Sequence, residues 1–88
     1  MSTSQSQWFV YILRCADNSL YTGITTDVQR REKEHNSSTR TAAKYTRARQ
    51  PVRVVYQETS ADRASASRRE AAIKQLNKQQ KEALIQET

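Results

Sequence analysis

Residues 8–13 read WFVYIL, a continuous run of aliphatic and aromatic side chains near the start of the chain. The run is too short for a helix and rich in β-branched and aromatic residues, so it predicts a central strand that is covered on both faces. Turn-forming residues follow at 16–19, and residues 20–24, LYTGI, predict a second strand. The two strands are therefore expected to form a hairpin.

The rest of the chain predicts one further strand and three helices. Thr26 and Asp27 resemble a helix N-cap, and Asn77 followed by Gln80 resembles a capping box. The predicted elements are a helix over 28–36, a polar basic connection over 37–50, a strand over 52–57, a helix over 62–76 and a last helix over 77–86. This order predicts an α/β (α+β) fold, a three-stranded antiparallel sheet flanked by about three helices. A flexible N-terminal tail over 1–7 is expected to precede a single domain over 8–86.

The charge and the cysteine content of the chain exclude several classes of protein. The chain has 88 residues, with 15 Lys and Arg against 9 Asp and Glu, a formal net charge of +6. This balance indicates an anionic partner such as nucleic acid, although it also serves solubility. A single cysteine excludes an intrachain disulfide, and one cysteine with one histidine cannot supply a four-ligand zinc site. No signal peptide or membrane span is visible, so a cytoplasmic protein is expected.

Polar residues occupy the expected inner face of the first helix. Val28, Arg31 and His35 follow i, i+3 and i+7 spacing, so a guanidinium and an imidazole share the stripe that should dock on the sheet. One interpretation is that these two polar side chains serve the function of the protein. The other is that the Arg31 stem lies on the core, its head group reaches water, and His35 sits at the rim.

The helix over 62–76 has an inward acid. Glu70 lies between Ala66 and Ile73 on the expected inner face, where a carboxylate is costly unless it is paired or metal-bound. An internal Glu70–Arg31 ion pair, a solvated Glu70 beside Arg69, and a polar pocket shared by the two helices remain open alternatives.

The ordered set of these residues resembles the GIY-YIG nuclease family. Residues 9–11, FVY, stand where the family has GIY, and residues 21–23, YTG, stand where it has YIG. Arg31 and His35 follow in the first helix, and Glu70 matches the single metal-binding acid. Within the family the chain is similar to the small stand-alone bacterial group called UPF0213 or YhbQ-like.

The resemblance implies a divalent-metal-dependent endonuclease or exonuclease that hydrolyses DNA, in DNA repair or in processing of damaged, branched or single-stranded DNA. Glu70 would hold Mg²⁺ or Mn²⁺, and Arg31 would bind phosphate oxygens. Tyr11 would orient or deprotonate the attacking water, Tyr21 would orient water or phosphate, and His35 would relay a proton or bind phosphate. The alternative is a catalytically weak nucleic-acid-binding module that needs a partner.

The connection over 37–50 is the expected contact surface for DNA, with RNA not excluded. It contains the basic and aromatic residues Arg40, Lys44, Tyr45, Arg47 and Arg49. Gly23 is the only glycine and is expected to have a structural role, at a bend or a close backbone approach. We expect a monomer without membrane contact, and a protein partner that supplies specificity is left open.

Overall fold

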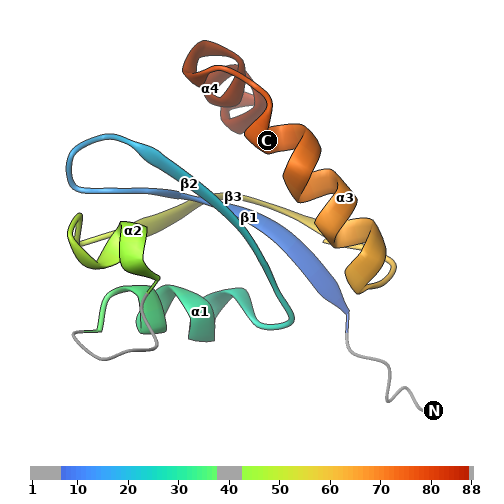
Figure 1. The fold of residues 1–88 in the computed structure, drawn as a ribbon, viewed down its shortest axis with the longest axis horizontal. Helices are drawn as coiled ribbons and strands as arrows, with labels where there is room; N and C mark the ends of the chain where they lie inside the picture. The colour runs from blue at the N-terminus through green and yellow to red at the C-terminus, as the bar shows by residue number, and fades with distance from the viewer. Residues whose placement is uncertain (1–6, 38–42, 88) are drawn as a thin grey trace.

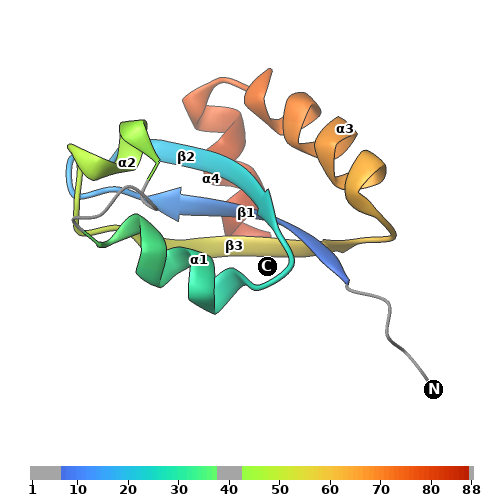
Figure 2. The same cartoon turned by 60° about the horizontal axis from the view of Figure 1, so that its bottom comes forward.

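The computed structural model describes residues 7–37 and 43–87. It has three layers, with a sheet between two groups of helices (Figures 1 and 2). Helix α1 (Val28–His35) lies against one face with the short α2 (Lys44–Arg47) beside it. Helices α3 (Arg63–Lys74) and α4 (Lys78–Gln86) cover the other face. Of the predicted tail over 1–7, only the exposed Gln7 lies among the described residues.

The sheet has the predicted three antiparallel strands. They are β1 (Trp8–Arg14), β2 (Leu20–Thr25) and β3 (Arg53–Ser60), in the order β2-β1-β3. The predicted central position of β1 is therefore confirmed. The third strand begins one residue later and runs three residues further than its predicted bounds of 52–57. An irregularity in its pairing lies opposite Ile12 and Leu13, where Val55 is the extra residue.

The apolar run of β1 supplies two cores because successive side chains of a strand point to opposite faces. Val10 and Ile12 pack with Ala66 and Ile73 beneath α3. The side chains of the other core lie on the α1 face; they are Tyr11, Leu13, Cys15, Val28 and Val52. The run is continuous in the sequence because helices cover both faces of the sheet.

Capping side chains fix where the helices begin. Asp27 accepts a hydrogen bond from the backbone N–H of Arg30 at 3.0 Å, so of the two residues predicted to cap α1 it is Asp27, and not Thr26, that is the N-cap. Asn77 accepts from the backbone N–H of Gln80 at 2.8 Å and Gln80 accepts from that of Asn77 at 2.9 Å, which confirms the predicted capping box. Helix α2 was not predicted and makes four helices in the described part of the chain.

Ion pairs connect helices α3 and α4 to the sheet. Arg14 at the end of β1 makes a bidentate salt bridge with Glu82 of α4, with N···O distances of 2.6 and 2.8 Å. Arg69 of α3 donates to Glu58 of β3 at 2.8 Å. No helix within residues 7–37 and 43–87 is long and apolar enough to cross a membrane.

Candidate active site

Three aromatic rings meet on the α1 face of the sheet. The Tyr11 hydroxyl oxygen lies 2.8 Å from Nε2 of His35. The Tyr21 ring lies edge-on to the His35 ring at a centroid distance of 5.1 Å. Tyr11 is on β1 and Tyr21 on β2, and the hairpin turns both phenols to one side. Together they form a site at the C-terminal end of α1.

Gly23 makes room for the Tyr11 side chain. The two residues are direct partners across the β1–β2 ladder, and the Tyr11 ring lies over the Gly23 backbone. A Cβ on residue 23 would stand 2.6 Å from the Tyr11 hydroxyl oxygen and 2.8 Å from Cζ. Both distances are far inside van der Waals contact, so any larger residue at position 23 would push the phenol away from His35.

The His35 ring is fully buried. It is 0% exposed, so the interpretation that placed it at the rim is wrong. Its end of the helix is pinned because the Asn36 side chain bonds to both backbone groups of Val52, at 2.7 and 2.9 Å. Gln50 donates to the His35 carbonyl at 2.7 Å. Burial, with Arg31 as the second cause, lowers the pKa of His35 to about 4, so the imidazole is neutral at pH 7.

The Tyr11 hydroxyl lies in the electrostatic field of several groups. Burial, followed by the neighbouring Tyr21, raises the pKa of Tyr11 well above its ordinary value. The Arg31 guanidinium acts in the opposite direction and Glu70 adds a smaller increase. The phenol is therefore protonated at neutral pH and needs a neighbouring group to accept its proton.

Arg31 and Glu70 reach this region from different helices. Arg31 is half-buried, and its Nη1 donates to Glu34 on the same helix at 2.8 Å. Glu70 is also half-buried, with Lys74 of its own helix 3.4 Å away. Helix α3 contacts β1 and β2 from the opposite face, and Glu70 is near enough for its charge to act on Tyr11. The charges of Arg31 and Glu70 thus both act on the Tyr11 phenol, and the effect of Arg31 is the larger.

The carboxylate of Glu70 fits a metal ion that takes few protein ligands. The described residues contain no group of three or more His, Cys, Asp or Glu that could enclose a cation. A single half-buried carboxylate suits a hard divalent ion such as Mg²⁺, which keeps several waters and takes phosphate oxygens from a substrate.

A buried threonine of α2 completes the site, although the sequence pattern does not predict it. The Thr46 hydroxyl oxygen lies 2.8 Å from Nδ1 of His35 and 3.0 Å from the carbonyl oxygen of Ala43. Thr46 is 0% exposed. Its neighbours Lys44 and Arg47 are exposed, so nothing in the pattern of this polar segment singles out residue 46.

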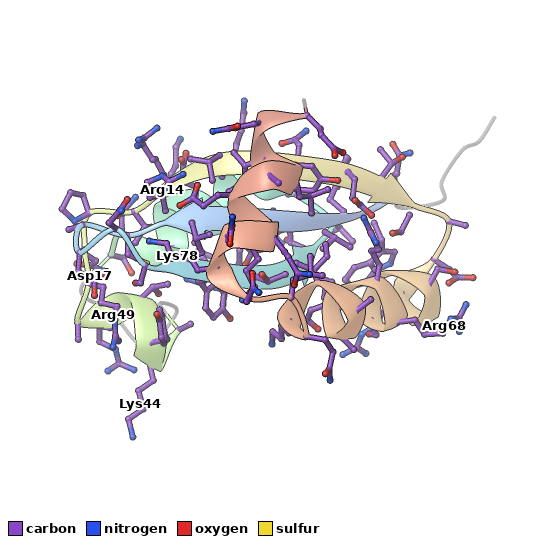
Figure 3. The ribbon with its side chains drawn as sticks, turned by 90° about the horizontal axis from the view of Figure 1, so that it is seen from above. Arg14, Asp17, Lys44, Arg49, Arg68 and Lys78 are labelled. Carbon is purple, nitrogen blue, oxygen red and sulfur yellow. The ribbon has the colours of Figure 1, made fainter. Side chains whose placement is uncertain are left out.

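The predicted DNA-contact residues on and after α2 differ in their surroundings. Lys44 and Arg47 are exposed, and the Lys44 side chain projects away from the ribbon (Figure 3). Arg49 lies beside Asp17 in the same view and donates to its carboxylate at 3.1 Å. The Arg49 guanidinium also lies 3.9 Å from the centroid of the Tyr45 ring. Arg40 lies outside the described residues.

Tyr45 extends the aromatic cluster toward the surface. Its ring centroid is 5.8 Å from that of Tyr21, which in turn contacts His35. The side chain is 38% exposed and carries the Arg49 guanidinium over its ring. The exposed part of Tyr45 thus continues the row of rings that starts at the buried imidazole.

Comparisons with known proteins give a family match and several relatives. The chain matches the family model described as "GIY-YIG catalytic domain" over residues 7–83. A UPF0213 protein of Desulfotalea psychrophila is 57% identical over 83 residues, which are 94% of this chain and 74% of the relative. A UPF0213 protein of Halobacterium salinarum is 52% identical over 76 residues, 86% of this chain and 96% of the relative.

Two solved structures are similar in sequence and in fold. The solution NMR structure of a UPF0213 protein from Bacillus halodurans is 45% identical, with a TM-score of 0.57 over 91% of this chain and 83% of that one. The solution NMR structure of a protein from E. faecalis is 40% identical, with a TM-score of 0.58 over 96% of this chain and 88% of that one.

Proposed function

Because the chain belongs to the GIY-YIG nuclease family, we propose that it hydrolyses phosphodiester bonds of DNA with the aid of a divalent metal ion. The substrates we propose are damaged, branched or single-stranded DNA, in repair or processing. The observation that carries the proposal is the 2.8 Å contact between the Tyr11 hydroxyl and Nε2 of the neutral, buried His35. This contact pairs a phenol with a base beside the Arg31 cation.

The Tyr11–His35 pair has the chemistry to activate water. A phenol with a raised pKa stays protonated at neutral pH and cannot take up a proton by itself, but it can relay one when a second base accepts the phenolic proton. A water proton would pass to the Tyr11 oxygen as the phenolic proton moves to His35, whose low pKa makes it hold this proton only transiently and return it by the same route once the ester bond has broken. The water oxygen forms the new P–O bond, the ester P–O bond breaks, and the leaving oxygen takes a proton from solvent. Tyr21, which contacts the imidazole, would orient the water or the phosphate.

The Arg31 side chain is suited to stabilise the negative charge that develops on the phosphate during attack by water. Its guanidinium is permanently charged and planar, so two of its N–H groups can bind non-bridging phosphate oxygens. The guanidinium already acts on the Tyr11 hydroxyl electrostatically and is only half-buried. It can therefore reach a phosphate placed beside the phenol.

Glu70 is the residue we propose as the metal ligand. GIY-YIG nucleases generally use divalent metal ions. When bound, such an ion supplies Lewis-acid polarisation of the phosphate and neutralises charge on the leaving oxygen. Mg²⁺ and Mn²⁺ both match a single carboxylate that shares the ion with water and substrate.

The exposed bases of α2 are the proposed contacts for the DNA backbone. Lys44 and Arg47 flank the buried Thr46 on the element that lies next to His35. Each phosphate contact in duplex DNA contributes about −0.9 to the slope of log affinity against log salt concentration. Changing both residues to Gln should therefore flatten this slope by about 1.8. Lys33→Gln with Lys81→Gln is a matched loss of charge on other helices and should leave the α2 contribution in place.

The decisive test is cleavage of labelled single-stranded, duplex and branched DNA, and of RNA, with Mg²⁺ or Mn²⁺. We expect cleavage of at least one DNA substrate that is abolished by EDTA and by Glu70→Gln. Glu87→Gln at the exposed end of α4 is the matched control and should retain activity. Binding without cleavage on every substrate would refute the nuclease proposal and support the nucleic-acid-binding alternative.

Arg31 allows a second matched comparison. Arg31→Ala should fold normally but lose turnover, because the charge donor to the phosphate is removed. Arg30→Ala, one residue away on the exposed side of α1, should cleave at the wild-type rate. Loss of the folded state in the first variant would instead show that Arg31 is needed for the fold.

A further inference from the structure

We propose that Thr46 is a positioning residue, whose hydroxyl holds His35 in the tautomer protonated at Nδ1 and leaves Nε2 free to accept the Tyr11 proton. The proposed effect on cleavage rests on the proposed nuclease function, whereas the tautomer itself is independent of any activity. Thr46 touches no reacting atom and acts only through the imidazole.

The hydrogen-bond geometry around the Thr46 hydroxyl leaves one assignment. Its oxygen is 3.0 Å from the Ala43 carbonyl oxygen and 2.8 Å from Nδ1 of His35. A carbonyl can only accept, and a hydroxyl has a single proton to donate. The Thr46 hydroxyl therefore donates its proton to the Ala43 carbonyl, and the Thr46 oxygen must accept a hydrogen bond from a protonated Nδ1.

The same reasoning then determines the hydrogen-bonding role of Nε2. A neutral imidazole carries one ring proton, so protonation at Nδ1 makes Nε2 an acceptor. His35 is fully buried, so bulk water does not compete for either nitrogen. The Tyr11 hydroxyl, 2.8 Å from Nε2, is then the donor in that contact. The hydrogen bonds run in one direction from the Tyr11 hydroxyl through His35 and Thr46 to the Ala43 carbonyl.

The orientation matters because only one tautomer can take the phenolic proton. If Nε2 carried the hydrogen, it would donate to the Tyr11 oxygen, and His35 would have no lone pair facing the phenol. The proton relay of the proposed mechanism would be blocked without any change in the position of the ring. Thr46 lies on the same short helix as the exposed Lys44 and Arg47, so the placement of α2 determines this orientation.

The substitution of Thr46 by valine should reverse the tautomer. Valine keeps the volume and β-branching of threonine but offers Nδ1 no acceptor. A buried N–H without a partner is costly, so the proton should move to Nε2 and donate to the Tyr11 oxygen, which requires the Tyr11 O–H to rotate away from the ring. Thr46→Ser keeps the hydroxyl and should retain the wild-type tautomer.

NMR spectroscopy can read this directly because His35 is the only histidine of the chain. Long-range ¹H–¹⁵N correlation of the ¹⁵N-labelled protein at pH 7 distinguishes a protonated from an unprotonated ring nitrogen. We expect protonation at Nδ1 in the wild type and in Thr46→Ser, and at Nε2 in Thr46→Val. A wild-type ring protonated at Nε2, or an unchanged tautomer in a folded Thr46→Val, would overturn the proposal. The wild-type spectrum decides the matter even where the valine variant does not fold.

Cleavage assays test the consequence separately. Cleavage by Thr46→Val should fall about 10- to 100-fold, as is common for groups that orient an imidazole, and Thr46→Ser should restore most of it. A valine variant with the reversed tautomer and the wild-type cleavage rate would refute the positioning role. A wild type that shows the Nδ1 tautomer but cleaves nothing would refute the proposed function and leave the tautomer assignment standing.

Discussion

The buried imidazole makes the stability of the protein depend on pH in a defined window. His35 has a pKa of about 4 in the folded protein, against an ordinary value of 6.5. Below pH 6.5 the unfolded chain therefore binds a proton that the folded chain rejects. This contribution to stability is complete above pH 6.5 and is lost progressively as the pH falls toward 4.

The size of the effect follows from these two pKa values. A difference of one in pKa corresponds to about 1.4 kcal/mol, so the full contribution is about 3 kcal/mol. By pH 5 about 2 kcal/mol of it should already be lost, before most carboxylates take up protons. The groups that act on the ring are Arg31, which lowers its pKa, and Glu34, which raises it.

Urea unfolding of the wild type and of His35→Gln between pH 7.5 and pH 5 provides the assay. Glutamine keeps hydrogen-bonding groups but does not titrate, so the pH-dependent loss should disappear while carboxylate effects stay common to both proteins. An NMR titration of the single histidine measures the folded-state pKa directly. A pKa near 6.5, or wild-type stability that does not change over this range, would refute the burial of a neutral imidazole.

Three further predictions concern strand β2 and the last helix. Gly23→Ala should lower the free energy of unfolding by about 1–3 kcal/mol, because its Cβ would overlap the Tyr11 hydroxyl, and wild-type stability in chemical denaturation would contradict this contact. Thr22→Val should instead raise the free energy of unfolding by about 1 kcal/mol, since the buried Thr22 hydroxyl has no hydrogen-bond partner among the described residues. The same substitution at Thr25, whose buried hydroxyl accepts from a backbone N–H at 3.1 Å, should be destabilising. Equal changes in the free energy of unfolding at both positions would contradict this difference in hydrogen bonding. Asn77→Ala should cost about 1 kcal/mol by removing the capping box and Asn77→Ser should cost less, with helix content from circular dichroism as the measurement.

The secondary structure was largely predictable because its determinants are local. The apolar run of β1, the Asp27 cap and the Asn77 capping box each act within a few residues, and all three appear where the sequence predicts them. The sequence does not predict the four-residue α2, since so short a helix has no apolar periodicity and is held by contacts with distant parts of the chain. Strand β3 ends later than its sequence pattern predicts because ladder pairing with β1 extends the strand through polar residues.

The sequence by itself determined which chemical groups this protein possesses: two phenols on neighbouring strands, an arginine and a histidine one turn apart on a helix, and a later glutamate. Their order and spacing sufficed to point to the nuclease family because they lie on elements that form locally. Only the tertiary structure decided that His35 is fully buried and bridges Tyr11 and Thr46. Protonation state and tautomer depend on desolvation and on partners 24 and 11 residues away, and no local pattern encodes those contacts.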